Sequence, residues 1–220
     1  MKHFSLRYSL LTYRLDQIWL PVGLLALFII MSLFLPEKIT ILARAYLGFV
    51  VPLMGGILTA YSILDDPAIE LRFAAPVSAA RTLIERLGLI LFIQMVNAGA
   101  FQIFCFIVGE DLSVFGGGVW SVQLAWLVPT LSLMALGVTG ALLAAQPMGG
   151  ALLVGVLWLL ELILRAWFAY HNVARYFLFF MRAAYPDIAW LTSNEIAVLL
   201  WTVLLFIAAW ALLHRQERYI

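Results

Sequence analysis

Long apolar runs separated by short polar turns constrain this chain more than any other feature of its sequence. A helix of about 20 apolar residues crosses the hydrocarbon of a bilayer, because its backbone polar groups bond to one another. Six such runs are present, over residues 18–35, 41–64, 87–109, 119–146, 148–170 and 196–213. With 65% hydrophobic and 11% charged residues, the chain is too apolar for a soluble domain of 220 residues. We therefore expect an all-α integral membrane protein with six transmembrane helices in a single domain, residues 1–220.

The residues ahead of the first run have a basic amphipathic pattern. Four apolar side chains share one helical face and lie among three basic ones: Phe4, Tyr8, Leu11 and Leu15, with Lys2, Arg7 and Arg14. A helix with this pattern lies along the lipid headgroups. We expect residues 1–17 to form such an N-terminal interfacial helix. Support of a cytoplasmic partner is the alternative role.

Residues 65–86 form the one long polar-rich stretch between two apolar runs. Its charged side chains are Asp65, Asp66, Glu70, Arg72, Arg81, Glu85 and Arg86. Charges this dense cannot lie in hydrocarbon, so the stretch must face water on one side of the membrane. Asp66 and Pro67 suit the start of a short helix. Pro76 then disfavours helix ahead of Ser78, which can cap a long helix that enters the membrane.

The expected short helix presents an apolar ridge among these charges. Ile69 and Phe73 are four residues apart, so their side chains share one helical face. An apolar patch exposed on a charged loop indicates a binding surface. We interpret this ridge as a docking surface for a partner.

Small residues within the apolar runs indicate close helix packing. Pro52, Gly55 and Gly56 lie in the middle of the second run, where they imply a kink or a close helix contact. Gly140 and Ala144 in the fourth run have the small-xxx-small spacing of tightly packed membrane helices.

Two pairs of polar side chains lie inside the third and fifth runs. Gln94 and Asn97 are three residues apart, and we expect them to bond to a neighbouring helix. Glu161 and Arg165 lie one helical turn apart, in an order that suits an intramembrane ion pair. Because isolated charges are costly at this depth, the pair is also a candidate for lining a translocation path. The alternative is that Arg165 extends to the membrane interface.

The helical pattern breaks between residues 171 and 194. The apolar stretch Tyr176–Met181 is too short to cross a bilayer, and Pro186 with Asp187 indicates a turn after it. We expect one or two re-entrant half-helices at the outer membrane face, which must be surrounded by protein or a water-filled cavity. Ser193 or Asn194 is expected to cap the last span.

Six spans return both termini to the same side of the membrane. If that side is the cytoplasm, eight basic residues lie inside and five outside, as the positive-inside rule favours. We therefore expect a multi-pass protein of the cell membrane, a bacterial inner membrane, with both termini and residues 65–86 in the cytoplasm.

The loop sequence ELRFAAPVSAAR, Glu70–Arg81, together with the six-span layout, resembles the permease subunit of a type-2 ABC exporter. The family typically has an acidic residue, a short apolar helix, and then proline with a small polar residue, and Glu70, Pro76 and Ser78 fit this pattern. The usual Gly-Thr ahead of the acidic residue is replaced by Pro67, Ala68 and Ile69, so the chain resembles a divergent member.

The resemblance implies a role for two segments. The short helix of the loop would be the coupling helix, seated in a groove of an ATPase subunit, and residues 171–194 would form the exit gate. The implied ATPase-coupling residues are Asp66, Pro67, Ile69, Glu70, Phe73 and Pro76. The implied partners are two copies of an ABC ATPase, a second copy of this permease or a paralogous one, and membrane lipid.

The chain lacks the residues for hydrolysing ATP itself. Its only lysines are Lys2 and Lys38, and neither ends a G-x-x-x-x-G-K-[ST] loop. We therefore expect no enzymatic activity and no cofactor in this chain, with ATP and Mg²⁺ used by the partner ATPase. A net charge of +1 without a basic run gives no case for nucleic acid.

Two other classes of function were weighed against an exporter. A non-transporting membrane scaffold or assembly subunit of a larger complex is the alternative. An intramembrane enzyme would need a cluster of catalytic residues, but the histidines lie in terminal or loop segments and no H-E-x-x-H motif occurs.

Overall fold

The computed structural model describes residues 16–62, 64 and 79–213, and within these residues every regular element is helical. The N-terminal part of the fold contains α2 (Asp16–Phe34), η1 (Pro36–Lys38), α3 (Ile39–Ala45), η2 (Tyr46–Val50) and α4 (Val51–Tyr61). The middle contains α6 (Ala79–Val108), η3 (Leu112–Phe115), α7 (Val119–Ala144) and α8 (Pro147–Tyr170). The C-terminal part contains η4 (Ala174–Phe177), α9 (Met181–Ala184) and α10 (Leu191–Leu213). The predicted interfacial helix lies almost entirely outside these residues.

Five helical stretches in the described part of the chain are long and apolar enough to cross a membrane, which confirms a helical, multi-pass architecture. They are Pro36–Tyr61, Arg81–Val108, Val119–Ala144, Pro147–Tyr170 and Leu191–Leu213. The first predicted span corresponds to α2, whose apolar part, Ile18–Phe34, is shorter than these five and than a typical spanning helix. Length therefore supports five of the six predicted spans.

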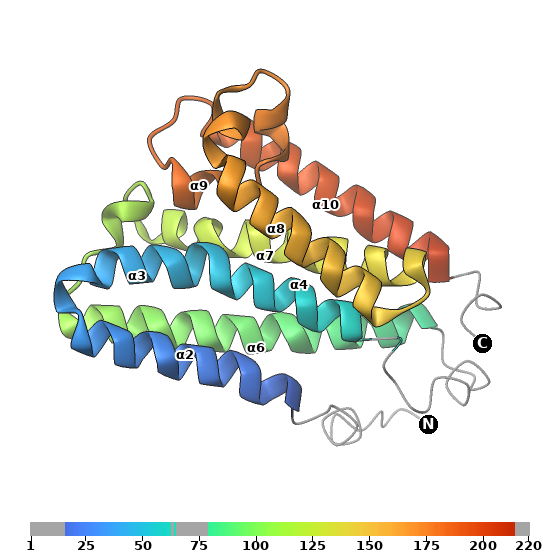
Figure 1. Cartoon of the computed structure of the whole chain (residues 1–220), viewed down its shortest axis with the longest axis horizontal. Coiled ribbons are helices and arrows are strands. Elements are labelled where there is room, and N and C mark those ends of the chain that lie inside the picture. The colour runs from blue at the N-terminus through green and yellow to red at the C-terminus, as the bar shows by residue number, and fades with distance from the viewer. Residues whose placement is uncertain (1–15, 63, 65–78, 214–220) are drawn as a thin grey trace.

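The helices run side by side along the long axis of the molecule, with α7 and α4 at the centre (Figure 1). The apolar stretch of α7 is 72% buried inside the protein and that of Pro36–Tyr61 is 61% buried, whereas those of α8 and α10 are 17% and 22% buried. α2 packs on α6 at one side, and α8 and α10 pack on α7 at the other. The outer helices expose apolar side chains, as lipid-facing helices do.

Glycines allow α4, α7 and α8 to meet at backbone distance. A Cβ atom on Gly137 would overlap the carbonyl oxygen of Gly56, and one on Gly150 would overlap the carbonyl oxygen of Gly137. A Cβ atom on Gly140 would lie 3.1 Å from the Cα atom of Gly150. Close approach of this kind increases van der Waals contact, which drives helix association in membranes. The close contacts predicted from Gly56 and from Gly140 are therefore confirmed.

The prediction for the polar residues of the third run is wrong for Asn97. Its side-chain amide donates to the Ile93 carbonyl of its own helix at 2.8 Å, and Gln94 is buried with no partner for its Nε2. A short polar side chain can reach the carbonyl one turn back, and this local bond replaced the interhelical one.

Hydroxyl groups instead connect α7 to α10. The hydroxyls of Ser132 and Thr202 lie 2.7 Å apart, and the Thr139 hydroxyl donates to the carbonyl of Leu205 at 2.9 Å. Each of these hydroxyls also lies within hydrogen-bond distance of the carbonyl four residues back in its own helix, so its single hydrogen has an acceptor in each of the two helices.

The long helix predicted after Ser78 is confirmed, since α6 begins at Ala79 and runs for 30 residues. It starts eight residues ahead of the predicted span 87–109 and carries charges in its first turns. Arg81 pairs with Glu85 at 2.9 Å, and the Arg86 guanidinium donates to the carbonyl of Ser62 after α4. The Arg86 contact joins the start of α6 to the end of α4.

Candidate functional site

Residues 171–190 connect α8 to α10 and consist mostly of turns. We call them the cap segment. It contains two short helices, η4 and α9, and lies at one end of the bundle (Figure 1). The sequence predicted one or two half-helices over 171–194. The final span begins at Leu191. Ser193 and Asn194, which were predicted to be the N-cap of this helix, therefore lie inside α10.

The middle of the cap segment, residues 178–183, is largely enclosed by protein, whereas residues 171–173, 177, 187 and 189 are exposed. Leu178 and Met181 are fully buried, and Phe180 and Ala183 are at most 1% exposed. Water cannot satisfy the peptide groups of such a segment, so protein groups must do so. Two side chains from the flanking helices supply these hydrogen bonds.

Glu161 of α8 provides an acceptor for this backbone. One oxygen of its carboxylate, Oε2, accepts from the N–H of Phe179 at 2.9 Å, and the side chain is 1% exposed. The other oxygen, Oε1, has no partner. Arg165 is exposed and forms no ion pair with Glu161, so the predicted pair is wrong. Helix spacing could not anticipate that a segment eighteen residues later supplies the partner of Glu161.

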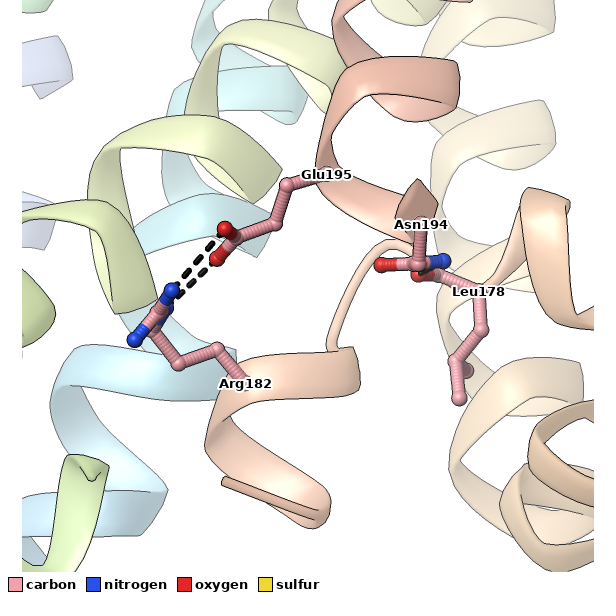
Figure 2. A network of polar contacts seen from close by, with 4 residues as sticks. All are labelled: Leu178, Arg182, Asn194 and Glu195. Atoms are coloured by element: carbon pink, nitrogen blue, oxygen red, sulfur yellow. Dashed lines mark hydrogen bonds and ion pairs between the residues drawn. The ribbon is translucent and has the colours of Figure 1, made fainter. Parts of the chain in front are cut away.

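Asn194 of α10 provides the matching donor. Its Nδ2 donates to the carbonyls of Leu178 at 3.0 Å and Arg175 at 2.5 Å, and the residue is 1% exposed. Figure 2 shows the Asn194 amide next to Leu178. Glu161 and Asn194 therefore bind opposite kinds of backbone group in the same irregular segment.

A bidentate ion pair connects α9 to α10 (Figure 2). Arg182 donates through Nε to Glu195 Oε1 at 2.5 Å and through Nη2 to Oε2 at 2.9 Å. The two side chains are 14% and 13% exposed, so the pair is mostly shielded from solvent. Two parallel bonds fix the relative orientation of the groups as well as their separation. Nothing in the sequence spacing identified this pair.

Aromatic contacts hold the remaining cation of the cap segment. The Arg175 guanidinium lies 4.8 Å from the ring centroid of Tyr176 and 5.3 Å from that of Trp190, in cation–π geometry. The Trp190 indole N–H donates to the carbonyl of Ala169 near the end of α8 at 3.2 Å. The cap segment is thus attached to both α8 and α10.

The polar side chains of this site hold the cap segment in position. Glu161 and Asn194 bond to the backbone, and Arg182 bonds to Glu195. No group of three or more His, Cys, Asp or Glu side chains able to hold a metal ion is present in the described ranges. The arrangement holds an irregular segment between α8 and α10.

The predicted ATPase-coupling residues, Asp66, Pro67, Ile69, Glu70, Phe73 and Pro76, lie outside the described residues. No protein-family model, no curated protein and no solved structure matches this chain.

Proposed function

We propose that this chain is the membrane-spanning permease subunit of an ATP-driven exporter of the ABC type-2 class. The observation that carries the proposal is the anchored cap segment. It is a broken stretch ahead of the last span, its middle is buried in protein, and Glu161 and Asn194 attach it to two spans. Irregular backbone at membrane depth is tolerated only where protein buries it or where it lines a water-filled cavity, and an exit gate meets this condition. The family resemblance of residues 70–81 points the same way.

In this proposal α2 is the first of six spans, and the termini and residues 65–86 lie in the cytoplasm of a bacterial cell. Two ATPase subunits close on ATP and push the Ile69 and Phe73 ridge. The long α6, which begins at Ala79 within this loop, transmits the motion into the bundle. Packed helices move as rigid bodies between discrete arrangements, so a push at one end reaches the cap segment at the other. A path opens between this chain and a second permease subunit.

The experiment replaces Phe73 with Asp and purifies the complex from its native membrane in mild detergent. We expect the ATPase to be lost from the complex, because a charge in the apolar ridge opposes docking. Leu71→Asp is the matched control, since it adds the same charge about 200° around the same expected helix. Mass spectrometry of the co-purified proteins is the readout.

Two results would contradict the proposal. If no ATPase accompanies the wild-type chain and other integral proteins do, the chain is a scaffold or assembly subunit. If an ATPase is present and remains after Phe73→Asp, the ridge is not its docking site.

A further inference from the structure

A π-helical turn interrupts the helix that starts at Pro36 and ends at Tyr61. In η2, Tyr46–Val50, the backbone N–H of Val51 donates to the carbonyl of Tyr46, five residues back. An α-helix would use a carbonyl four residues back, so η2 holds one extra residue. Four of its five residues are buried.

Pro52 gives a local reason for this turn. Proline has no N–H, and in a regular helix its ring would clash with the carbonyl of residue 48. The wider π turn lies directly ahead of Pro52, which is in the first turn of α4. The kink expected from Pro52 in the sequence therefore takes the form of a π turn. Such turns occur often at functional positions of helices.

One side of η2 contacts the cap segment and α8. The indole N–H of Trp158 donates to the carbonyl of Phe49 at 3.0 Å, across 109 residues of sequence. The Phe49 ring lies 5.2 Å from the ring of Phe180. A Cβ atom on Gly48 would overlap the Cβ of Ala183 in α9, so the backbone of η2 touches the cap segment directly.

The other side of η2 contacts the two helices on the opposite side of the bundle. The Tyr46 ring lies 5.1 Å from Phe28 of α2 and 4.6 Å from Phe101 of α6. The turn is therefore in contact with α2, α6, α8 and the cap segment, and a change in its geometry affects all four.

We propose that η2 is a hinge that links the register of α3 to the position of the cap segment, and that Trp158 holds it in the π form. Return of this turn to α geometry shifts α3 against α4 by one residue, about 1.5 Å along the axis and about 100° around it. That shift withdraws Gly48 and Phe49 from α9. The cap segment is therefore released when η2 returns to α geometry. The hinge is a property of the isolated chain and does not rest on the proposed transport function.

The test is hydrogen–deuterium exchange, read by mass spectrometry on the full chain in lipid nanodiscs. Trp158→Phe removes the N–H that donates to Phe49 but keeps an aromatic ring. Pro52→Ala restores a backbone N–H and removes the ring that opposes α geometry. We expect both variants to raise exchange in residues 174–184 by about fivefold, the effect of losing roughly one hydrogen bond. Trp19→Phe is the control, because this tryptophan of α2 is 70% exposed.

A reciprocal variant tests the link from the other end. Ala183→Gly removes the methyl group that faces Gly48 and is expected to raise exchange in residues 46–50. The inference is overturned if Trp158→Phe and Pro52→Ala leave residues 174–184 at the exchange rate of the control. It is equally overturned if Ala183→Gly leaves residues 46–50 unchanged, because a hinge must respond from both sides.

Discussion

The carboxylate of Glu161 accepts a hydrogen bond from the backbone N–H of Phe179, 2.9 Å away and eighteen residues later in the chain. This bond joins a regular membrane helix to a segment that is neither helix nor strand at that point. An acidic side chain in an apolar helix thus serves here as a backbone acceptor.

Replacing Glu161 tests this role. We expect Glu161→Leu to lower the free energy of unfolding by about 2 kcal/mol, because a buried N–H loses its acceptor. Glu161→Gln keeps an oxygen for Phe179 and should cost clearly less. Thermal unfolding in detergent, followed by intrinsic fluorescence, measures the differences. Arg165→Leu is the control, and a Glu161→Leu protein as stable as that control would contradict the role.

Removing one partner of the ion pair between Arg182 and Glu195 is expected to destabilise the fold more than removing both. Arg182→Met or Glu195→Leu leaves a mostly buried charge unpaired, at a cost of about 3 kcal/mol or more. The double variant Arg182→Met/Glu195→Leu should lose less than either single change. A double-mutant cycle on unfolding temperatures measures the coupling.

The pair Arg81 and Glu85 provides a matched comparison, since its side chains are 60% and 33% exposed. Removing it should cost about 0.3–0.5 kcal/mol. Equal costs for the two pairs would show that shielding from solvent does not set the strength of the Arg182 pair.

The close contact of α4 and α7 at Gly56 and Gly137 predicts opposite effects on stability for two glycine-to-alanine substitutions. Gly137→Ala places a methyl group against the Gly56 carbonyl, and we expect it to destabilise the fold by about 1–3 kcal/mol. A Cβ on Gly155 of α8 meets nothing within 4 Å, so Gly155→Ala should stabilise by about 0.5–1 kcal/mol through helix propensity. Unfolding temperatures of the two variants should therefore move in opposite directions. If Gly137→Ala is as stable as Gly155→Ala, the helices do not cross as closely as described.

The sidedness of the chain can be tested with single added cysteines and a membrane-impermeant maleimide. Ser113→Cys and Gln146→Cys lie at opposite ends of α7, at exposed positions, and should label from opposite sides of the membrane. Arg72→Cys should label from the same side as Gln146→Cys, which is the cytoplasm if the proposed function holds. The native Cys105 is buried and serves as the unlabelled background. Labelling of Arg72→Cys from outside the cell would exclude an ATPase contact there.

The helix contacts at glycines and the anchors of the cap segment illustrate what sequence patterns can and cannot predict. Gly56 and Gly140 indicated close packing correctly, and Pro52 indicated an interrupted helix, because the lack of a side chain and backbone restriction are properties of the residue itself. The partner of Glu161 and the pair of Arg182 with Glu195 were missed, because those contacts join segments 18 and 13 residues apart through an irregular loop. Local periodicity carries no information about such a loop.

The sequence by itself predicted six apolar spans and where their short connections lie, and five of these spans are long enough in the structure to cross a membrane. Only the tertiary structure decided which of them are central. The mean hydropathy of the α6 and α7 spans is the same, 1.9, yet 33% of one and 72% of the other is buried in protein. Lipid and protein interior are almost equally apolar, so hydropathy places a helix in the membrane without distinguishing its neighbours. Glycine contacts, shared hydroxyls and the anchors of the cap segment make that distinction, and they exist only once the helices are packed.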